Sequence, residues 1–239
     1  MWAKTHEAFK YIYENHFDDA DWFMKADDDT FVVLENLRYL LYQYSSDFPV
    51  YFGQVLKESV STKINTQKTL FSNFKIKLYM AGGSGYVLSK ESLQRFYKKG
   101  VLENKCPIDE NNEDLMLGFC MKKLKVIAGD SRDNLMRERF FQFQPDIALP
   151  DHPKDPGFWY HTYTWFQLRY GQKRCCSDTL VSTHYVTPQE MYLYEYLIYK
   201  VQVNGFESIY DEQLPKKISH AEFWKNVDDG KIENKFQNV

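Results

Sequence analysis

The stretch "DWFMKADDDTFVVLENLRYLL" (residues 21–41) decides the fold class of this chain of 239 residues. Its apolar run, residues 22–26, predicts a buried strand. The three carboxylates that follow mark the strand's C-terminal end, because adjacent charges cannot be buried in a sheet. Apolar residues then recur at helical spacing from Val33 to Tyr44, and residues 50–53 predict the next strand. Strand, helix and strand together indicate an α/β unit.

Similar elements flank this unit, and their alternation predicts an α/β fold with a mostly parallel sheet flanked by helices. Residues 58–77 are polar and aperiodic, which predicts a loop or an insertion, and the polar residues 205–239 predict a tail behind a domain of residues 1–204. The other predicted elements are a helix over 5–16 capped by Thr5, a helix over 90–100 capped by Ser89, a helix from Glu113 to about 124 capped by Asn112, a short strand over 126–128 and a helix from Pro188 to about 200 opened by a capping box of Thr187 and Glu190.

Composition excludes some classes of function. The net charge is -3 and the basic residues are scattered, so no nucleic-acid partner is expected. No run approaches the roughly 20 apolar residues that cross a bilayer, and the start shows no signal-peptide pattern, so no membrane segment is predicted in this chain. Aromatic residues make up 17%, which suits a thick aromatic core or a carbohydrate-binding surface. The even cysteine count is compatible with disulfides and with free thiols.

The triplet Asp27, Asp28 and Asp29 is the sharpest chemical feature. Adjacent carboxylates repel one another, so they need either full solvation, as in an ordinary turn, or a nearby cation. A hard divalent ion coordinated by oxygen would supply that cation, and ligands gather at the C-terminal ends of strands in open α/β sheets. The segment "YMAGGSGYVL" (residues 79–88) packs three glycines between apolar residues, which allows a close backbone approach to a ligand or a sharp bend.

Several blocks together resemble the core 1 β1,3-galactosyltransferase family. The resemblance implies a GT-A-like glycosyltransferase fold and transfer of galactose from UDP-galactose to the 3-hydroxyl of N-acetylgalactosamine on Ser or Thr, with Mn²⁺ and with inversion. Members of that family are type II membrane proteins of the Golgi lumen, and their anchor, stem and first strands precede the point where this sequence begins. The blocks are "DWFMKADDDTFVVLENLRYLL", "AGGSGYVLSKESLQRF", "EDLMLGFCM", "AGDSRD", "FWY" and "CCSDTLVSTHYV".

The resemblance assigns the metal and nucleotide side of the site. Asp27 and Asp29 match the family's DxD motif and would hold Mn²⁺, with Asp28 beside the nucleotide. His184 matches a further metal ligand, although a lone histidine in an apolar strand is more often a core residue. Mn²⁺ accepts a mixed shell of imidazole and carboxylate. Gly82 and Gly83 match the glycine-rich segment near the donor.

The resemblance also assigns the base and the acceptor side. Asp114 matches the catalytic base, and Glu113 beside it would orient a sugar. At a helix N-terminus the dipole keeps a carboxylate ionised, which suits a base and equally suits ordinary capping. Trp159 and Tyr185 match positions that contact the acceptor N-acetylgalactosamine, with core packing as the alternative. Disulfides between Cys106 and Cys120 and between Cys175 and Cys176 remain hypotheses.

Other interpretations stay open at this point. One is a non-catalytic paralogue that acts as a folding chaperone or binding partner of the active enzyme, although the acidic triplet, Asp114 and His184 favour the enzyme. Another is a related β1,3-transferase that uses UDP-N-acetylglucosamine. His161 and Thr162 depart from the family pattern after "FWY", which bears on acceptor preference. A homodimer is also open, because the sequence does not fix the oligomeric state.

Overall fold

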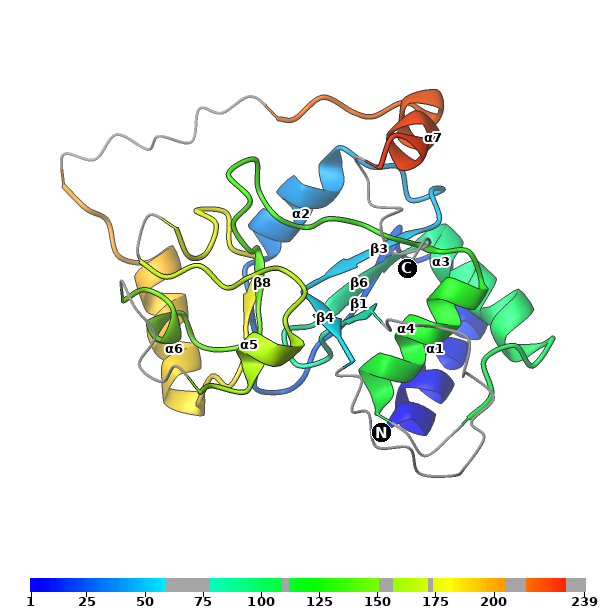
Figure 1. Cartoon of the computed structure of the whole chain (residues 1–239), viewed down its shortest axis with the longest axis horizontal. Helices are drawn as coiled ribbons and strands as arrows, with labels where there is room; N and C mark the ends of the chain where they lie inside the picture. Colours follow the sequence, from blue (N-terminus) through cyan, green and yellow to red (C-terminus); the bar gives the residue numbers. More distant parts are fainter. Residues whose placement is uncertain (59–77, 109–111, 151–156, 172–173, 205–213, 231–239) are drawn as a thin grey trace.

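The computed structural model of the chain describes residues 1–58, 78–108, 112–150, 157–171, 174–204 and 214–230. At its centre lies a four-stranded sheet with the strand order β1-β6-β3-β7, and Figure 1 shows β1, β6 and β3 side by side. Its strands are β1 (Trp22–Lys25), β6 (Tyr86–Ser89), β3 (Val50–Gly53) and β7 (Ile127–Ala128). The strands predicted over 22–26, 50–53 and 126–128 are therefore present.

This central sheet is mixed. β6 pairs antiparallel with β1 and with β3, whereas β3 and β7 pair parallel. The cause lies between β3 and β6, where β4 (Val55–Lys57) pairs antiparallel with β5 (Leu78–Met80). Because β5 runs back along β4, the chain enters β6 in the direction opposite to β1 and β3. The predicted α/β class is confirmed, but the predicted mostly parallel sheet is not.

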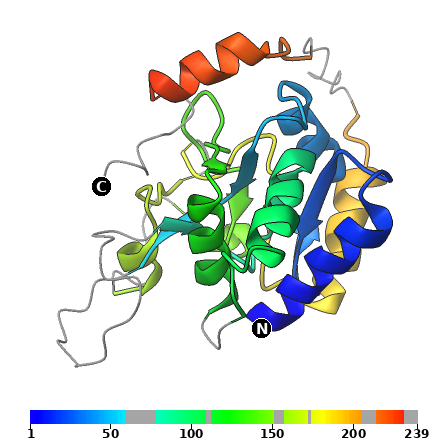
Figure 2. The same cartoon turned by 90° about the vertical axis from the view of Figure 1, so that its right-hand side faces the viewer.

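One face of the sheet is covered by α1 (Trp2–His16), α3 (Lys90–Arg95) and α4 (Glu113–Lys123), which Figure 2 shows side by side. α3 continues into the π-helical segment η1 (Phe96–Val101), so helical backbone runs one residue past Gly100. The buried core under these helices is rich in aromatic residues and includes Trp2, Phe9, Tyr86, Leu88, Phe96 and Met121.

The opposite face is covered by α2 (Leu34–Tyr42) and α7 (His220–Asp228). α7 lies within the segment that was predicted to be a polar tail. Ser219 caps it by accepting a hydrogen bond from Glu222 N, and the Phe223 ring stacks on Phe48 with 4.1 Å between centroids. Part of the expected tail therefore packs against the core, because Phe223 and Val227 form a short apolar stripe on one side of this helix.

A second sheet supports the site and has the order β2-β9-β8. β9 (Ser182–Thr183) pairs antiparallel with β2 (Phe31–Val32) and parallel with β8 (Phe140–Phe141). The helices in this part of the chain are η2 (Pro145–Ile147), α5 (Tyr160–Tyr163) and α6 (Pro188–Tyr199), and Tyr194 of α6 contacts Phe31 of β2. Because β2 follows the acidic triplet, β9 brings a distant segment directly to it.

The helix caps test the predicted helix starts. Ser89 accepts a hydrogen bond from Ser92 N, and Thr187 and Glu190 form the predicted reciprocal capping box. Asn112 occupies the N-cap position of α4 but its side chain makes no capping hydrogen bond. Thr5 is not a cap: α1 begins at Trp2, because the buried Trp2 side chain extends the apolar face of the helix toward the N-terminus.

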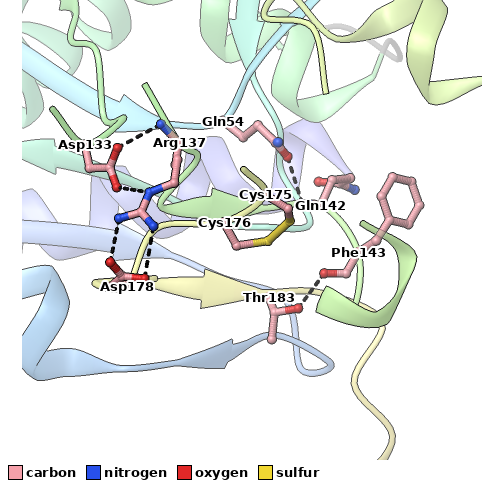
Figure 3. Close-up of a disulfide and its surroundings, with 9 residues drawn as sticks. All are labelled: Gln54, Asp133, Arg137, Gln142, Phe143, Cys175, Cys176, Asp178 and Thr183. Carbon is pink, nitrogen blue, oxygen red and sulfur yellow. Dashed lines mark hydrogen bonds and ion pairs between the residues drawn. A yellow bond between two sulfur atoms is a disulfide. The ribbon is translucent and has the colours of Figure 1, made fainter. Parts of the chain in front are cut away.

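Both hypothesised disulfides are present, joining Cys106 to Cys120 and Cys175 to its neighbour Cys176. The first ties the segment before α4 to the middle of that helix. Figure 3 shows the second beside the bidentate pairing of Arg137 with Asp178. Within the described ranges no helix has the length and apolar character needed to cross a membrane. The loop predicted over 58–77 lies, apart from Glu58, outside the described residues.

Candidate active site

Asp27, Asp29 and His184 meet at the C-terminal end of β1. One ligand atom of each side chain lies within 4.8 Å of the other two. His184 Nε2 is 3.0 Å from Asp29 Oδ1 and 3.8 Å from Asp27 Oδ2. Asp28 is exposed and lies outside this group. Two carboxylates and one imidazole form a donor set that suits Mn²⁺, so the residues present fit the expected metal.

Backbone pairing explains how these distant residues meet. β2 and β9 pair Phe31 with Thr183, so the residues just before β2 lie beside the residue just after β9. Beyond this strand pair, Val186 N donates a hydrogen bond to Asp29 O at 2.9 Å, which keeps the two segments side by side. Thr30 Oγ1 donates to Gly83 O at 2.6 Å and ties the triplet to the glycine-rich segment. The sheet topology therefore holds the acidic turn in place.

The two predicted glycines lie in close contact with neighbouring side chains. A Cβ atom at Gly83 would lie 2.2 Å from His184 Cε1 and 2.7 Å from Gln142 Nε2. A Cβ atom at Gly82 would lie 2.9 Å from Glu113 Oε2. At Gly83 these distances leave no room for a side chain, whereas at Gly82 the Glu113 carboxylate would have to move. Their predicted contact with a donor sugar remains a prediction.

Asp114 stands in the first turn of α4 and faces the glycine segment. Its Oδ2 accepts a hydrogen bond from Gly82 N at 3.3 Å, and its Oδ1 accepts one from Leu115 N at 2.8 Å. Burial raises the pKa of Asp114 above its usual value, against the opposing effects of these hydrogen bonds and of Lys25. Desolvation is the largest of these effects. A raised pKa suits a general base.

Glu113 is buried and lies between two polar partners. The Tyr86 hydroxyl donates to Glu113 Oε1, and Lys25 Nζ lies 3.7 Å from Glu113 Oε2. Burial raises the pKa of Glu113, while Tyr86 and Lys25 oppose that rise. Lys25 also forms an ion pair with Asp27 at 2.6 Å. Lys25 and Tyr86 were not predicted, although Lys25 precedes Asp27 by two residues and therefore leaves the strand on the same side.

Trp159 and Tyr185 gather around one aromatic ring. Phe143 lies 5.8 Å from the Trp159 ring and stacks on Tyr185 at 5.7 Å, measured between centroids. Both outer side chains are about half exposed, at 47% and 51%. The core-packing alternative is therefore disfavoured. The centroids of the Tyr185 and His184 rings are 4.0 Å apart, so this aromatic cluster adjoins the group formed by Asp27, Asp29 and His184.

A cavity of about 690 Å³ opens between α1 and the end of β1. Asp27, Asp28, Asp29, Glu113 and His184 line it together with Lys25 and residues of α1. Its size suits a ligand of several hundred daltons. Asp114 is not among the lining residues; it stands behind Glu113, on Gly82. The predicted metal, nucleotide and base residues thus form one neighbourhood, with the aromatic acceptor candidates at its His184 side.

A comparison with known proteins gives the family of this chain. The Fringe-like family matches residues 2–146, more than half of the chain, and the chain belongs to this family. Relatives include a β-1,3-glucosyltransferase from Mus musculus, 28% identical over 153 residues, and chondroitin sulfate synthase 3 from Homo sapiens, 27% identical over 120 residues. These relatives are named for glucosyl transfer and for chondroitin sulfate synthesis.

Another relative is more similar to this chain than these two proteins are. Glycoprotein-N-acetylgalactosamine 3-beta-galactosyltransferase 1 from Xenopus laevis is 38% identical over 215 residues, which is 90% of this chain. The resemblance to core 1 β1,3-galactosyltransferases is therefore confirmed. The matched part is 55% of the Xenopus protein and 26% of the mouse protein, so the chain spans about half or less of these relatives' lengths.

Proposed function

We propose that this chain carries the catalytic centre of an inverting galactosyltransferase that uses UDP-galactose, Mn²⁺ and O-linked N-acetylgalactosamine. The convergence of Asp27, Asp29 and His184 within 4.8 Å, beside the buried Glu113, carries the proposal. Similarity to a galactosyltransferase over 90% of the chain supports the choice of sugars. Residues 1–204 would form the catalytic part, working in the Golgi lumen.

Asp27, Asp29 and His184 would hold Mn²⁺, which neutralises negative charge on the departing diphosphate and so stabilises the transition state. Asp28 is exposed at the rim of the same cavity, which suits contact with the nucleotide. Gly82 and Gly83 would allow the donor sugar to approach the backbone. Glu113, held by Tyr86 and Lys25, would accept a hydrogen bond from a sugar hydroxyl.

Asp114 would act as the base. The 3-hydroxyl oxygen of N-acetylgalactosamine attacks the anomeric carbon of galactose, its proton passes to the Asp114 carboxylate, and the bond from that carbon to the UDP oxygen breaks. A single displacement inverts the anomeric centre, so one base is sufficient. Hydrogen bonds from Gly82 N and Leu115 N fix the orientation of this carboxylate.

Trp159 and Tyr185 would hold the acceptor sugar. Exposed aromatic rings bind the apolar face of a sugar, and their polar edges remain solvated. Their packing on Phe143 fixes both rings, and Tyr185 follows His184 directly. The acceptor would therefore reach the reaction centre from the side of α5 and α6.

The decisive experiment measures UDP release with a peptide bearing N-acetylgalactosamine on Ser or Thr. Residues 1–239 and the longest polypeptide of the gene should be assayed in parallel, with and without Mn²⁺, across a panel of UDP-sugars. Mn²⁺-dependent turnover with UDP-galactose is expected. Turnover with UDP-N-acetylglucosamine alone would identify that nucleotide sugar as the donor in place of UDP-galactose. Absence of turnover with every UDP-sugar in both polypeptides would contradict the enzymatic proposal and favour a chaperone or binding role.

A further inference from the structure

Lys25 occupies a central place among the carboxylates of the site. Its ammonium group lies 2.6 Å from Asp27 Oδ1 and 3.7 Å from Glu113 Oε2, and it donates to Gly82 O at 3.1 Å. The side chain is largely buried, at 19% exposure. A lysine held by three oxygen atoms in a partly buried position is fixed in orientation, in contrast to a solvated surface lysine.

Gly82 connects this lysine to the base. Its carbonyl oxygen accepts from Lys25, and its amide nitrogen donates to Asp114 Oδ2 at 3.3 Å. The cation and the base therefore hold opposite ends of one glycine residue. A shift of Lys25 moves the Gly82 amide and, with it, the Asp114 carboxylate.

The same ammonium group competes with any cation for Asp27. A divalent ion held by Asp27, Asp29 and His184 would share Asp27 with the Lys25 ammonium group, and the two positive charges would repel each other. Lys25 engages Asp27 Oδ1, whereas Asp27 Oδ2 is the oxygen that faces His184, so Lys25 would act on a bound metal through its charge. Lys25 would thus lower metal affinity while it orders the base.

We propose that Lys25 is a positioning residue that holds Glu113, Gly82 and Asp114 in their reactive arrangement and tunes metal affinity downward by pairing with Asp27. The inference rests on the proposed function of this site. It predicts opposite effects on two quantities, because loss of the charge frees Asp27 for the metal and releases Gly82 and Asp114. A residue needed only for folding would weaken both metal binding and catalysis.

The test combines Mn²⁺ titration by calorimetry with steady-state kinetics for three variants at position 25. Lys25→Met is expected to bind Mn²⁺ at least about threefold more tightly than wild type, because the repulsion is removed. Its kcat for sugar transfer should fall at least about tenfold, with a smaller change in KM for the donor. Lys25→Arg keeps the charge and should restore wild-type metal affinity.

Lys25→Gln separates the charge from the hydrogen bond, and it also serves if the methionine variant fails to fold. It can still donate to Gly82 O, so tighter metal binding with a smaller loss of kcat is expected. Lys10→Met is the matched control, because Lys10 pairs with Glu7 on α1 and is not among the cavity-lining residues. It should change neither quantity.

The two proposals fail in distinguishable ways. Lack of turnover in the wild type contradicts the proposed function, whereas the calorimetric comparison still measures competition between Lys25 and the metal. Unchanged or weaker Mn²⁺ binding in both Lys25→Met and Lys25→Gln, in a wild type that is active, would overturn the role assigned to Lys25. Thermal unfolding of each variant identifies any loss of fold.

Discussion

Gln142 donates a hydrogen bond from Nε2 to Nδ1 of His184 across 3.2 Å. The direction follows from the other end of the amide, where Gln142 Oε1 accepts from Ser84 N at 3.1 Å. The backbone of Gln142 is itself fixed by the Gln54 side chain (Figure 3). His184 Nδ1 therefore acts as the acceptor, and a neutral ring with this contact would carry its proton on Nε2, which faces Asp29 Oδ1 at 3.0 Å.

This arrangement predicts that Gln142→Glu increases metal affinity. A metal bound at Nε2 requires the proton on Nδ1, and an amide nitrogen cannot accept it, whereas a carboxylate accepts from both Nδ1 and Ser84 N. We expect Mn²⁺ to bind about tenfold more tightly to Gln142→Glu, measured by calorimetry. Gln142→Leu removes the bond without supplying an acceptor and is the control. Equal affinity of Gln142→Glu and wild type would contradict the assigned tautomer.

The three aspartates of the triplet should behave differently from one another. Asp27 and Asp29 face His184, so Asp27→Asn and Asp29→Asn should each weaken Mn²⁺ binding by at least about tenfold. Asp28→Asn removes the same charge from an exposed side chain and should leave metal affinity within about threefold of wild type. Its effect should appear in KM for the UDP-sugar. Equal losses of metal affinity in all three variants would indicate a diffuse electrostatic effect without specific coordination.

The sequence predicts the triplet's position well, because three charges end a strand for purely local reasons. It does not predict β6 running antiparallel, since this depends on the β4–β5 pair, whose connecting residues have no periodic pattern. The proximity of Asp29 and His184 is predicted only through the family resemblance, because it depends on the pairing of β2 with β9. Gln142 carries no spacing signal of its own, and the spacing of Lys25 from Asp27 indicates a shared side but no partner. Both roles depend on contacts made only in the folded chain.

The base predicts a specific pH dependence. Burial raises the pKa of Asp114, and a base must be ionised to accept a proton. Activity should therefore decline as the pH falls through this raised pKa, so the acid limb of kcat/KM should lie above the usual aspartate range. Asp114→Asn should lower kcat by about 10²–10⁴-fold with metal affinity retained. Calorimetry with Mn²⁺ is the control, and a variant that keeps more than a tenth of the activity excludes Asp114 as the base.

The packing of α7 predicts a large effect of one substitution on stability. The Phe223 ring is fully buried and stacks on Phe48, so Phe223→Ala leaves a cavity in the core between α2 and α7. The free energy of unfolding should fall by about 3–5 kcal/mol, measured by denaturant titration. Lys225→Ala changes an exposed residue of the same helix and should stay within about 0.5 kcal/mol. Similar small effects of both variants would mean that α7 is not docked in solution, and that the polar segment after residue 205 behaves as the tail its composition suggests.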